Sequence, residues 1–205
     1  MEIGHIDYLN LLPFYQFLKK KGIKVKKSYP AKVNEWFEKG YVKAAFISSV
    51  KAKNKRCYPV GIAARGRVRT VLVCPGEGYD SESATSNVLA EILKVNGRVV
   101  IGDKAFKEKK CKDLAEIWFE KYGLPFVFAL FCANADFKKY EKLIYEFIKS
   151  RQKIPYKILK TYAEKAGISY KEAKDYLDNV IYYDLGWREK KALKKFWYLT
   201  DKGKR

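Results

Sequence analysis

Residues 2–49 decide the fold, and they read EIGHIDYLNLLPFYQFLKKKGIKVKKSYPAKVNEWFEKGYVKAAFISS. Short apolar runs alternate here with segments whose apolar residues recur at helical spacing. The expected strands cover 2–6, 24–28 and 44–47, and the expected helices cover 10–22 and 30–40. We expect Asn10 to cap the first helix and Gly22 to end it, while Pro30 opens the second helix. Strand, helix, strand, helix, strand is typical of an α/β sheet.

The alternation continues through the middle of the chain and then changes. Expected here are a strand at 68–74, a helix opened by 81–86, a strand at 99–101, a helix over 113–123 and an apolar strand at 126–132. The remainder is mostly helical, with a capping box at Ser169 and Glu172 and a short strand at 180–183. The pattern predicts two α/β lobes with a helical C-terminal tail.

The composition excludes several classes of protein. The chain has 205 residues, of which 48% are hydrophobic, enough to bury a core and too many for intrinsic disorder. No apolar run approaches the roughly 18 residues that a membrane span needs. The N-terminus has neither the basic nor the long apolar region of a secretory signal, so we expect a cytoplasmic protein.

The cysteines and the single histidine argue against a metal site. Cys57, Cys74, Cys111 and Cys132 form no CxxC pair, and His5 is far from all of them in sequence. We expect four reduced, buried thiols in a reducing compartment. A catalytic triad could use only His5, which lies in the first strand.

The strongest compositional feature is a formal net charge of +20. Basic proteins often bind nucleic acid, but the excess here is mostly lysine on predicted helix faces in residues 1–66 and 135–205. No zinc finger, RNP1 motif or clear helix-turn-helix supports a nucleic-acid interface. We expect solvated lysine-rich helices, and a positive field that would also attract a small anionic substrate.

Hydroxyl and amide side chains gather where predicted strands end. They are Asn10, the pair at 48–49 and the run at 81–86. Ligands of open α/β sheets bind beyond the carboxyl ends of the strands, and helix N-termini attract anions. Because no phosphate-binding loop is present, a carboxylate ligand fits better than a phosphate.

Seven segments, taken in order, resemble the chorismate dehydratase (MqnA) family of the futalosine route to menaquinone. They are GHIDYLNLLP at 4–13, FISS at 46–49, GRVRTV at 66–71, SATS at 83–86, IGDKA at 101–105, GLPFVFA at 123–129 and IYYDLG at 181–186. Each motif alone is weak, but their common order covers nearly the whole chain. At 205 residues the chain is short for that family.

The resemblance implies a two-lobed, periplasmic-binding-protein-like (type 2) α/β fold with a helical C-terminal tail. Residues 1–66 plus 134–205 would form lobe I, and 67–133 would form lobe II. The implied reaction removes water from chorismate to give 3-[(1-carboxyvinyl)oxy]benzoate. Because aromatisation of the ring drives that reaction, neither a redox cofactor nor a metal is expected. The expected partner is this small molecule, with no nucleic acid and no membrane.

The resemblance also assigns site residues. Asn10 matches the amide of the family's YLN motif, and Thr70 stands where the family commonly has an active-site serine; both are expected to be catalytic. The added methyl of Thr70 stiffens the side chain and narrows the pocket. Expected substrate-binding residues are Ser48, Ser83, Thr85 and Ser86. Ser83 could equally be only a helix cap.

Other polar residues of these motifs are expected to stay outside the chemistry. We expect Asp103 to cap or hinge the backbone and His5 to point into the protein. Arg67 and Arg69 could clamp a carboxylate, but strand alternation directs them to solvent.

Three alternatives remain open. The sister enzyme that makes 1,4-dihydroxy-6-naphthoate normally has a histidine base in its second half, which this chain lacks. A non-catalytic protein binding small carboxylates would share the fold. A basic nucleic-acid-binding module would show salt-sensitive retention on nucleic acid.

Overall fold

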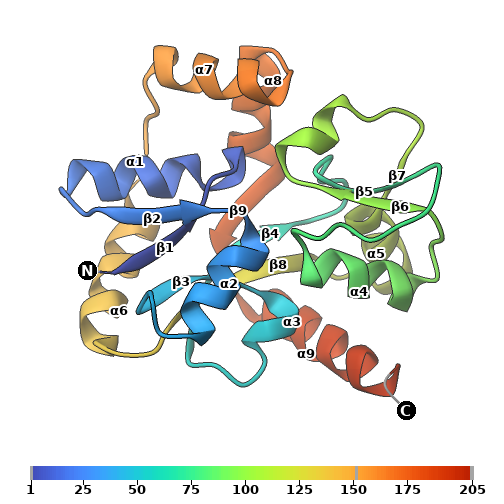
Figure 1. Ribbon diagram of the computed structural model, residues 1–205, viewed down its shortest axis with the longest axis horizontal. Helices are drawn as coiled ribbons and strands as arrows, with labels where there is room; N and C mark the ends of the chain where they lie inside the picture. The colour runs from blue at the N-terminus through green and yellow to red at the C-terminus, as the bar shows by residue number, and fades with distance from the viewer. Residues whose placement is uncertain (1, 151, 204–205) are drawn as a thin grey trace.

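Two β-sheets organise the protein in the computed structural model, which describes residues 2–150 and 152–203 (Figure 1). The larger sheet has the strand order β2-β1-β3-β8-β4-β9, and the smaller has the order β6-β5-β7. The strands are β1 (Ile3–Ile6), β2 (Val25–Ser28), β3 (Ala44–Ser48), β4 (Cys57–Ala64), β5 (Val71–Cys74), β6 (Arg98–Ile101), β7 (Lys112–Asp113), β8 (Phe126–Ala133) and β9 (Ile181–Asp184). The chain leaves the larger sheet after β4 and returns to it with β8.

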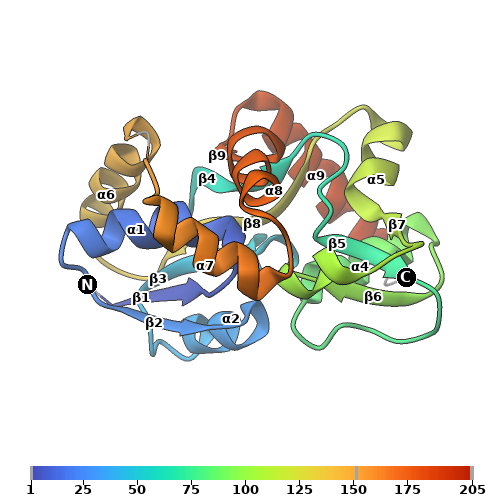
Figure 2. The ribbon, with the colours of Figure 1, turned by 90° about the horizontal axis from the view of Figure 1, so that it is seen from above.

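The helices flank both sheets, and Figure 2 shows α7 lying over α1. They are α1 (Leu12–Lys20), α2 (Pro30–Glu38), α3 (Ser49–Ala52), α4 (Ala84–Leu93), α5 (Leu114–Tyr122), α6 (Phe137–Lys149), α7 (Tyr156–Ala166), α8 (Tyr170–Asp175) and α9 (Trp187–Lys202). Short helical turns are η1 (Leu9–Leu11), η2 (Asp103–Lys107) and the π-turn η3 (Tyr176–Val180). In residues 2–150 and 152–203, no helix is long and apolar enough to span a membrane.

The strand directions follow from the connections. β1 runs parallel to β2 and β3, because a helix crosses between each consecutive pair. β8 is antiparallel to both β3 and β4, and β9 is antiparallel to β4. The predicted alternation over residues 2–49 is confirmed, as is the short strand near residue 181.

Two hydrophobic clusters form the core. The first lies on the larger sheet, where Phe14, Phe46 and Phe131 meet edge to face with centroids 5.2–5.7 Å apart. The second joins the smaller sheet to the helical tail, and Phe196 of α9 packs against Trp118 and Phe126. The tail is therefore part of the core around the smaller sheet and not an appendage.

Three local predictions were wrong or incomplete. The strand expected at 68–74 begins only at Val71, because Arg69 adopts a left-handed φ of 66° and donates its N–H to Asp113. Asn10 does not cap α1; it lies inside η1, and Leu11 holds the cap position. The interior strand β4 was not predicted at all.

The cysteines contradict the expectation of free thiols. Cys57 and Cys132 face each other across β4 and β8 and form one disulfide. Cys74 and Cys111 form a second, between the end of β5 and the loop before β7. The bonded cysteines are 75 and 37 residues apart in sequence, so their spacing does not reveal the pairs. Pairing of β4 with β8 and of β5 with β7 brings them together.

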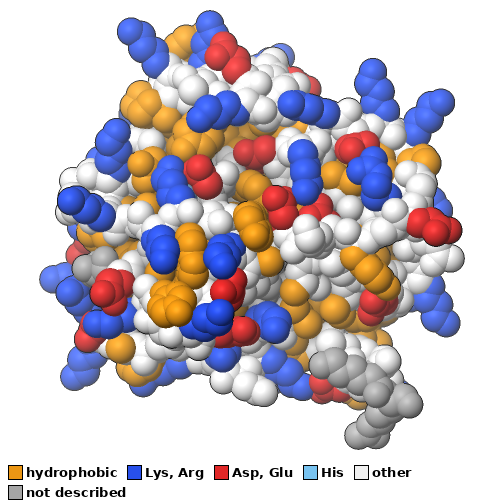
Figure 3. All heavy atoms as spheres, in the orientation of Figure 1, with side chains coloured by type: hydrophobic (Ala, Val, Ile, Leu, Met, Phe, Trp, Pro, Cys, Tyr) orange, Lys and Arg blue, Asp and Glu red, His pale blue; other side chains and the backbone are white. Residues whose placement is uncertain are grey.

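Charged side chains are spread over the surface. On the face in Figure 3, Lys and Arg are scattered with Asp and Glu among them, and they do not gather into one basic patch. Several lysines of the protein pair with nearby carboxylates, such as Lys39 with Glu35 at 2.8 Å. This face therefore has the mixed, solvated character that the lysine-rich helices predicted.

Candidate active site

One cavity of about 60 Å³ brings together residues from both sheets and from the tail. It contains all six site residues expected from the sequence: Asn10, Ser48, Thr70, Ser83, Thr85 and Ser86. Apolar side chains such as Ile62 and Phe128 complete its wall. The cavity is much smaller than the several hundred Å³ of typical ligand pockets, so its walls must move apart to admit a ligand of ordinary size.

Asn10 presents an unsatisfied acceptor at this cavity. Its backbone oxygen accepts a hydrogen bond from the Tyr183 hydroxyl at 2.5 Å, which holds η1 in place. Its amide acts to lower the pKa of Tyr176, against the larger opposite effect of burial, and both residues line the cavity. Its Oδ1 is buried and has no partner among the described residues. A buried amide oxygen without a partner needs a donor, and a ligand can supply one.

Thr70 lies at the end of an irregular turn that a buried carboxylate holds. Asp113 caps α5 through the N–H groups of Ala115 and Glu116 and accepts the N–H groups of Val68 and Arg69 as well. This turn places the Thr70 hydroxyl 3.0 Å from the Tyr176 hydroxyl. Thr70 is buried and lines the cavity.

Ser48 is fixed by a residue that the sequence analysis missed. The buried Asn34 in α2 donates from Nδ2 to the Ser48 Oγ at 2.8 Å and accepts the Ser48 N–H at 3.1 Å. This double contact leaves the Ser48 hydroxyl hydrogen as the group available to a ligand. The apolar spacing of α2 predicts only core residues on the helix face that carries Asn34.

The start of α4 carries the other three hydroxyls. Ser83 is the N-cap, and its Oγ both accepts the Ser86 N–H at 3.1 Å and donates to the Ser86 Oγ at 2.8 Å. The Thr85 Oγ1 accepts the N–H of Val50 at 3.3 Å. Ser83 is therefore satisfied internally, whereas the hydroxyl hydrogens of Thr85 and Ser86 remain free to donate.

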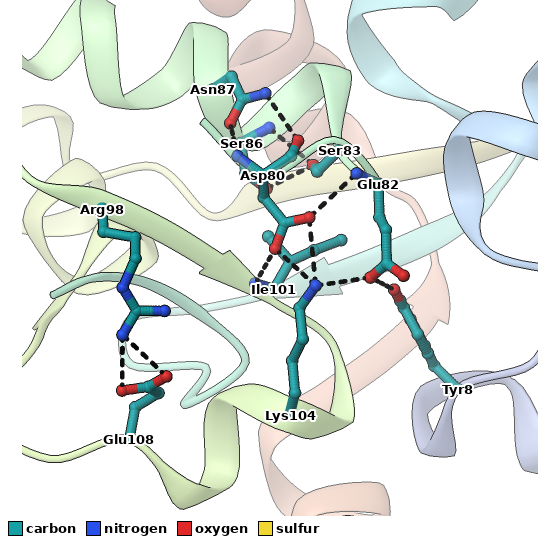
Figure 4. A network of polar contacts seen from close by, with 10 residues as sticks. All are labelled: Tyr8, Asp80, Glu82, Ser83, Ser86, Asn87, Arg98, Ile101, Lys104 and Glu108. Carbon is teal, nitrogen blue, oxygen red and sulfur yellow. Dashed lines mark hydrogen bonds and ion pairs between the residues drawn. The ribbon is translucent and has the colours of Figure 1, made fainter. Parts of the chain in front are cut away.

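Ionised groups surround the cavity without lining it. Figure 4 shows Lys104 between the carboxylates of Asp80 and Glu82, at 3.0 and 2.8 Å, and the Tyr8 hydroxyl donating to Glu82 at 2.7 Å. Among the described residues, no lysine or arginine lines the cavity itself. These contacts join the N-terminal segment to the middle segment at the cavity rim.

The backbone at Gly102 lies close to the ring of Tyr8. Gly102 has a φ of 71°, and a Cβ added there would lie 2.5 Å from the Tyr8 ring. Asp103 follows it and accepts the Leu9 N–H with both carboxylate oxygens, at 3.0 and 3.1 Å. Burial raises the pKa of Asp103 to about 6. Asp103 thus binds the backbone, as expected of a capping residue.

The remaining candidates lie outside the cavity. His5 is 1% exposed and packs against Phe14 and Tyr15, and burial lowers its pKa to about 3. Arg67 is exposed, and Arg69 is half-buried and pairs with Asp175 at 3.3 Å. None of the three lines the cavity.

Comparison with known proteins identifies a family model and a curated relative that match nearly the whole chain. A family model described as menaquinone biosynthesis matches residues 1–97 and 93–202. A chorismate dehydratase of Campylobacter jejuni subsp. jejuni serotype O:23/36 (strain 81-176) is 41% identical, with 96% of each chain covered.

Solved structures agree on the fold. A structural-genomics protein from Archaeoglobus fulgidus aligns with a TM-score of 0.66 and 13% identity, covering 99% of this chain and 97% of that one. The periplasmic aliphatic sulphonate-binding protein of Escherichia coli aligns with a TM-score of 0.60 and 11% identity, covering 100% and 92%. The fold is therefore that of the periplasmic binding proteins, as predicted.

Proposed function

We propose, because this chain belongs to the menaquinone biosynthesis family, that it is a chorismate dehydratase. The reaction removes water from chorismate and gives 3-[(1-carboxyvinyl)oxy]benzoate. The enzyme is then a carbon–oxygen lyase that acts on a small dianion. The observation that carries this proposal is the hydrogen-bonding polarity of the cavity.

The cavity offers several donors and one buried acceptor. The hydroxyls of Ser48, Thr85 and Ser86 already accept from protein groups, so they can donate to a ligand. The Oδ1 of Asn10 can only accept. Chorismate has two carboxylates, which accept, and a single hydroxyl, which can donate. The serine and threonine hydroxyls therefore suit the carboxylates, and Asn10 suits the hydroxyl.

The chemistry needs placement more than a strong base. The ring C–H bond and the neighbouring C–O bond break, and the lost proton and hydroxide leave together as water while the ring becomes aromatic. A substrate carboxylate takes the ring proton and passes it to the departing hydroxyl, which Asn10 and Thr70 hold and which leaves as water. The fixed dipoles of these buried side chains stabilise the developing charge without reorganising.

Incubation of the purified protein with chorismate tests the proposal. We expect the aromatic product, lighter than chorismate by one water, to appear by chromatography with mass detection. Asn10→Ala is expected to lower turnover at least about tenfold, or about 1.4 kcal/mol in barrier. Asn179→Ala, which removes an exposed amide outside the cavity, is the matched control.

The outcomes separate the competing functions. Chorismate that binds but does not react would replace the enzyme with a carboxylate-binding protein of the same fold. Formation of 1,4-dihydroxy-6-naphthoate from that pathway's later intermediate would indicate the sister enzyme. Chorismate that neither binds nor reacts would overturn the proposal.

Two further predictions belong with this proposal. The division into lobe I, 1–66 plus 134–205, and lobe II, 67–133, stays a prediction, and limited proteolysis near Gly66 and Ala133 would test it. A cytoplasmic location also stays a prediction. Because disulfides are more typical of oxidising compartments, cell fractionation combined with thiol labelling is the relevant measurement.

A further inference from the structure

Tyr176 lines the cavity together with both proposed catalytic residues, Asn10 and Thr70. It begins η3, a π-turn at the end of α8, and π-turns are frequent at functional sites. Its ring is 1% exposed and packs edge to face on Phe106, with centroids 5.1 Å apart. Its hydroxyl lies 3.0 Å from the Thr70 Oγ1, and Tyr176, Thr70 and Asn10 all line the cavity.

The hydrogen bonds around this hydroxyl can be assigned by elimination. Asn10 acts to lower the pKa of Tyr176, as a donor near the tyrosine oxygen does, and its Oδ1 has no partner among the described residues, so we assign Nδ2 as the atom that faces the hydroxyl. The tyrosine hydrogen is then available for the Thr70 Oγ1 at 3.0 Å. Burial raises the pKa of Tyr176, so the hydroxyl keeps this hydrogen.

We propose that Tyr176 is a positioning residue that decides which atoms of Asn10 and Thr70 face the substrate. By accepting from the Asn10 Nδ2, it turns Oδ1 toward the cavity; by donating to the Thr70 Oγ1, it leaves the threonine hydrogen free to donate there. This inference rests on the proposed dehydratase function. It adds that the leaving hydroxyl of chorismate donates to Asn10 and accepts from Thr70.

Loss of the Tyr176 hydroxyl should change the orientation of the Asn10 amide. Without the tyrosine hydroxyl, the Asn10 amide can rotate and present its NH2 group to the cavity. That group cannot accept from the substrate hydroxyl, and the Thr70 hydrogen loses its fixed direction. Substrate carboxylates would still meet Ser48, Thr85 and Ser86, which Tyr176 does not contact. Turnover should therefore fall more than substrate binding.

Tyr176→Phe removes only the hydroxyl and keeps the ring that packs on Phe106. We expect kcat to fall at least about tenfold while KM changes less than about threefold. Tyr140→Phe is the matched control, because Tyr140 is equally buried, contacts the Glu2 backbone and lies outside the cavity. It should leave kcat unchanged while showing what loss of a buried tyrosine hydroxyl does to thermal stability.

A double-mutant cycle separates positioning from an independent structural effect. If Tyr176 acts through Asn10, then Tyr176→Phe should lower kcat little further in an Asn10→Ala background. Two fully multiplicative losses, or wild-type kcat in folded Tyr176→Phe, would overturn the inference while leaving the dehydratase function intact. A wild-type protein that neither binds nor converts chorismate would overturn both.

Discussion

Two titratable groups beside the N-terminal segment should give the protein opposing responses to acid. His5 is enclosed by Phe14 and Tyr15, and burial together with the positive charge of Lys27 holds its pKa at about 3, against 6.5 in an exposed histidine. Partial burial raises the pKa of Asp103 from 3.8 to about 6, although the hydrogen bond from the Leu9 N–H acts to lower it. The relevant acidification runs from about pH 6.5 to about pH 4.5.

The signs of the two contributions differ. Over this range the unfolded chain protonates His5 and the folded protein does not, so the free energy of unfolding falls by about 2.3 kcal/mol. The folded protein protonates Asp103 before the unfolded chain does, so the same acidification raises the free energy of unfolding by about 1.8 kcal/mol. In the wild type these two contributions largely cancel.

Single variants should separate them. The free energy of unfolding of His5→Phe, measured by urea titration relative to the wild type, should rise by about 2.3 kcal/mol between the two pH values. That of Asp103→Asn, which keeps an oxygen for the Leu9 N–H, should fall by about 1.8 kcal/mol. Packing changes cancel, because they act equally at both pH values. A difference between variant and wild type that does not depend on pH would refute the reasoning.

Three further perturbations have defined outcomes. Thr70→Ser keeps the hydroxyl that meets Tyr176 and should retain turnover within about threefold, whereas Thr70→Ala should lower it about tenfold; equal rates for both would contradict a role for the hydroxyl. Gly102→Ala places a methyl against the Tyr8 ring and should raise KM by opening the cavity rim, which steady-state kinetics would detect; an unchanged KM would mean that the rim need not close. Reduction of the Cys57–Cys132 disulfide, which spans 75 residues, should lower the free energy of unfolding by about 4 kcal/mol, and urea titrations with the same midpoint before and after reduction would exclude this.

Local chemistry explains which features were predictable from the sequence. The capping box at Ser169 and Glu172 is present because both partners lie within one helical turn. Asn10 and Ser48 meet in one cavity because β1 and β3 are parallel and direct their ends to the same side. The hydroxyls at the start of α4 reach this cavity from the side of the smaller, antiparallel sheet. These signals depend on a few neighbouring residues and on a general rule of topology.

Long-range contacts explain most of what was missed. Tyr176 reaches Thr70 across 106 positions, and nothing in its helical surroundings distinguishes it from a core tyrosine. Asn34 occurs on a helix face that otherwise carries core residues. β4 contains both a proline and a glycine, which disfavour a strand, yet pairing with β8 and β9 on either side stabilises it.

The position of the tail in the core has a consequence for synthesis of the protein. Tyr176 enters the cavity, β9 pairs with β4, and Phe196 packs on Trp118, so late parts of the chain complete structures that begin early. While the ribosome is still adding these residues, the nascent chain has neither a finished larger sheet nor a closed cavity. It must meanwhile keep apolar surface around Trp118 uncovered, which makes this stage the one most exposed to aggregation and to chaperone binding.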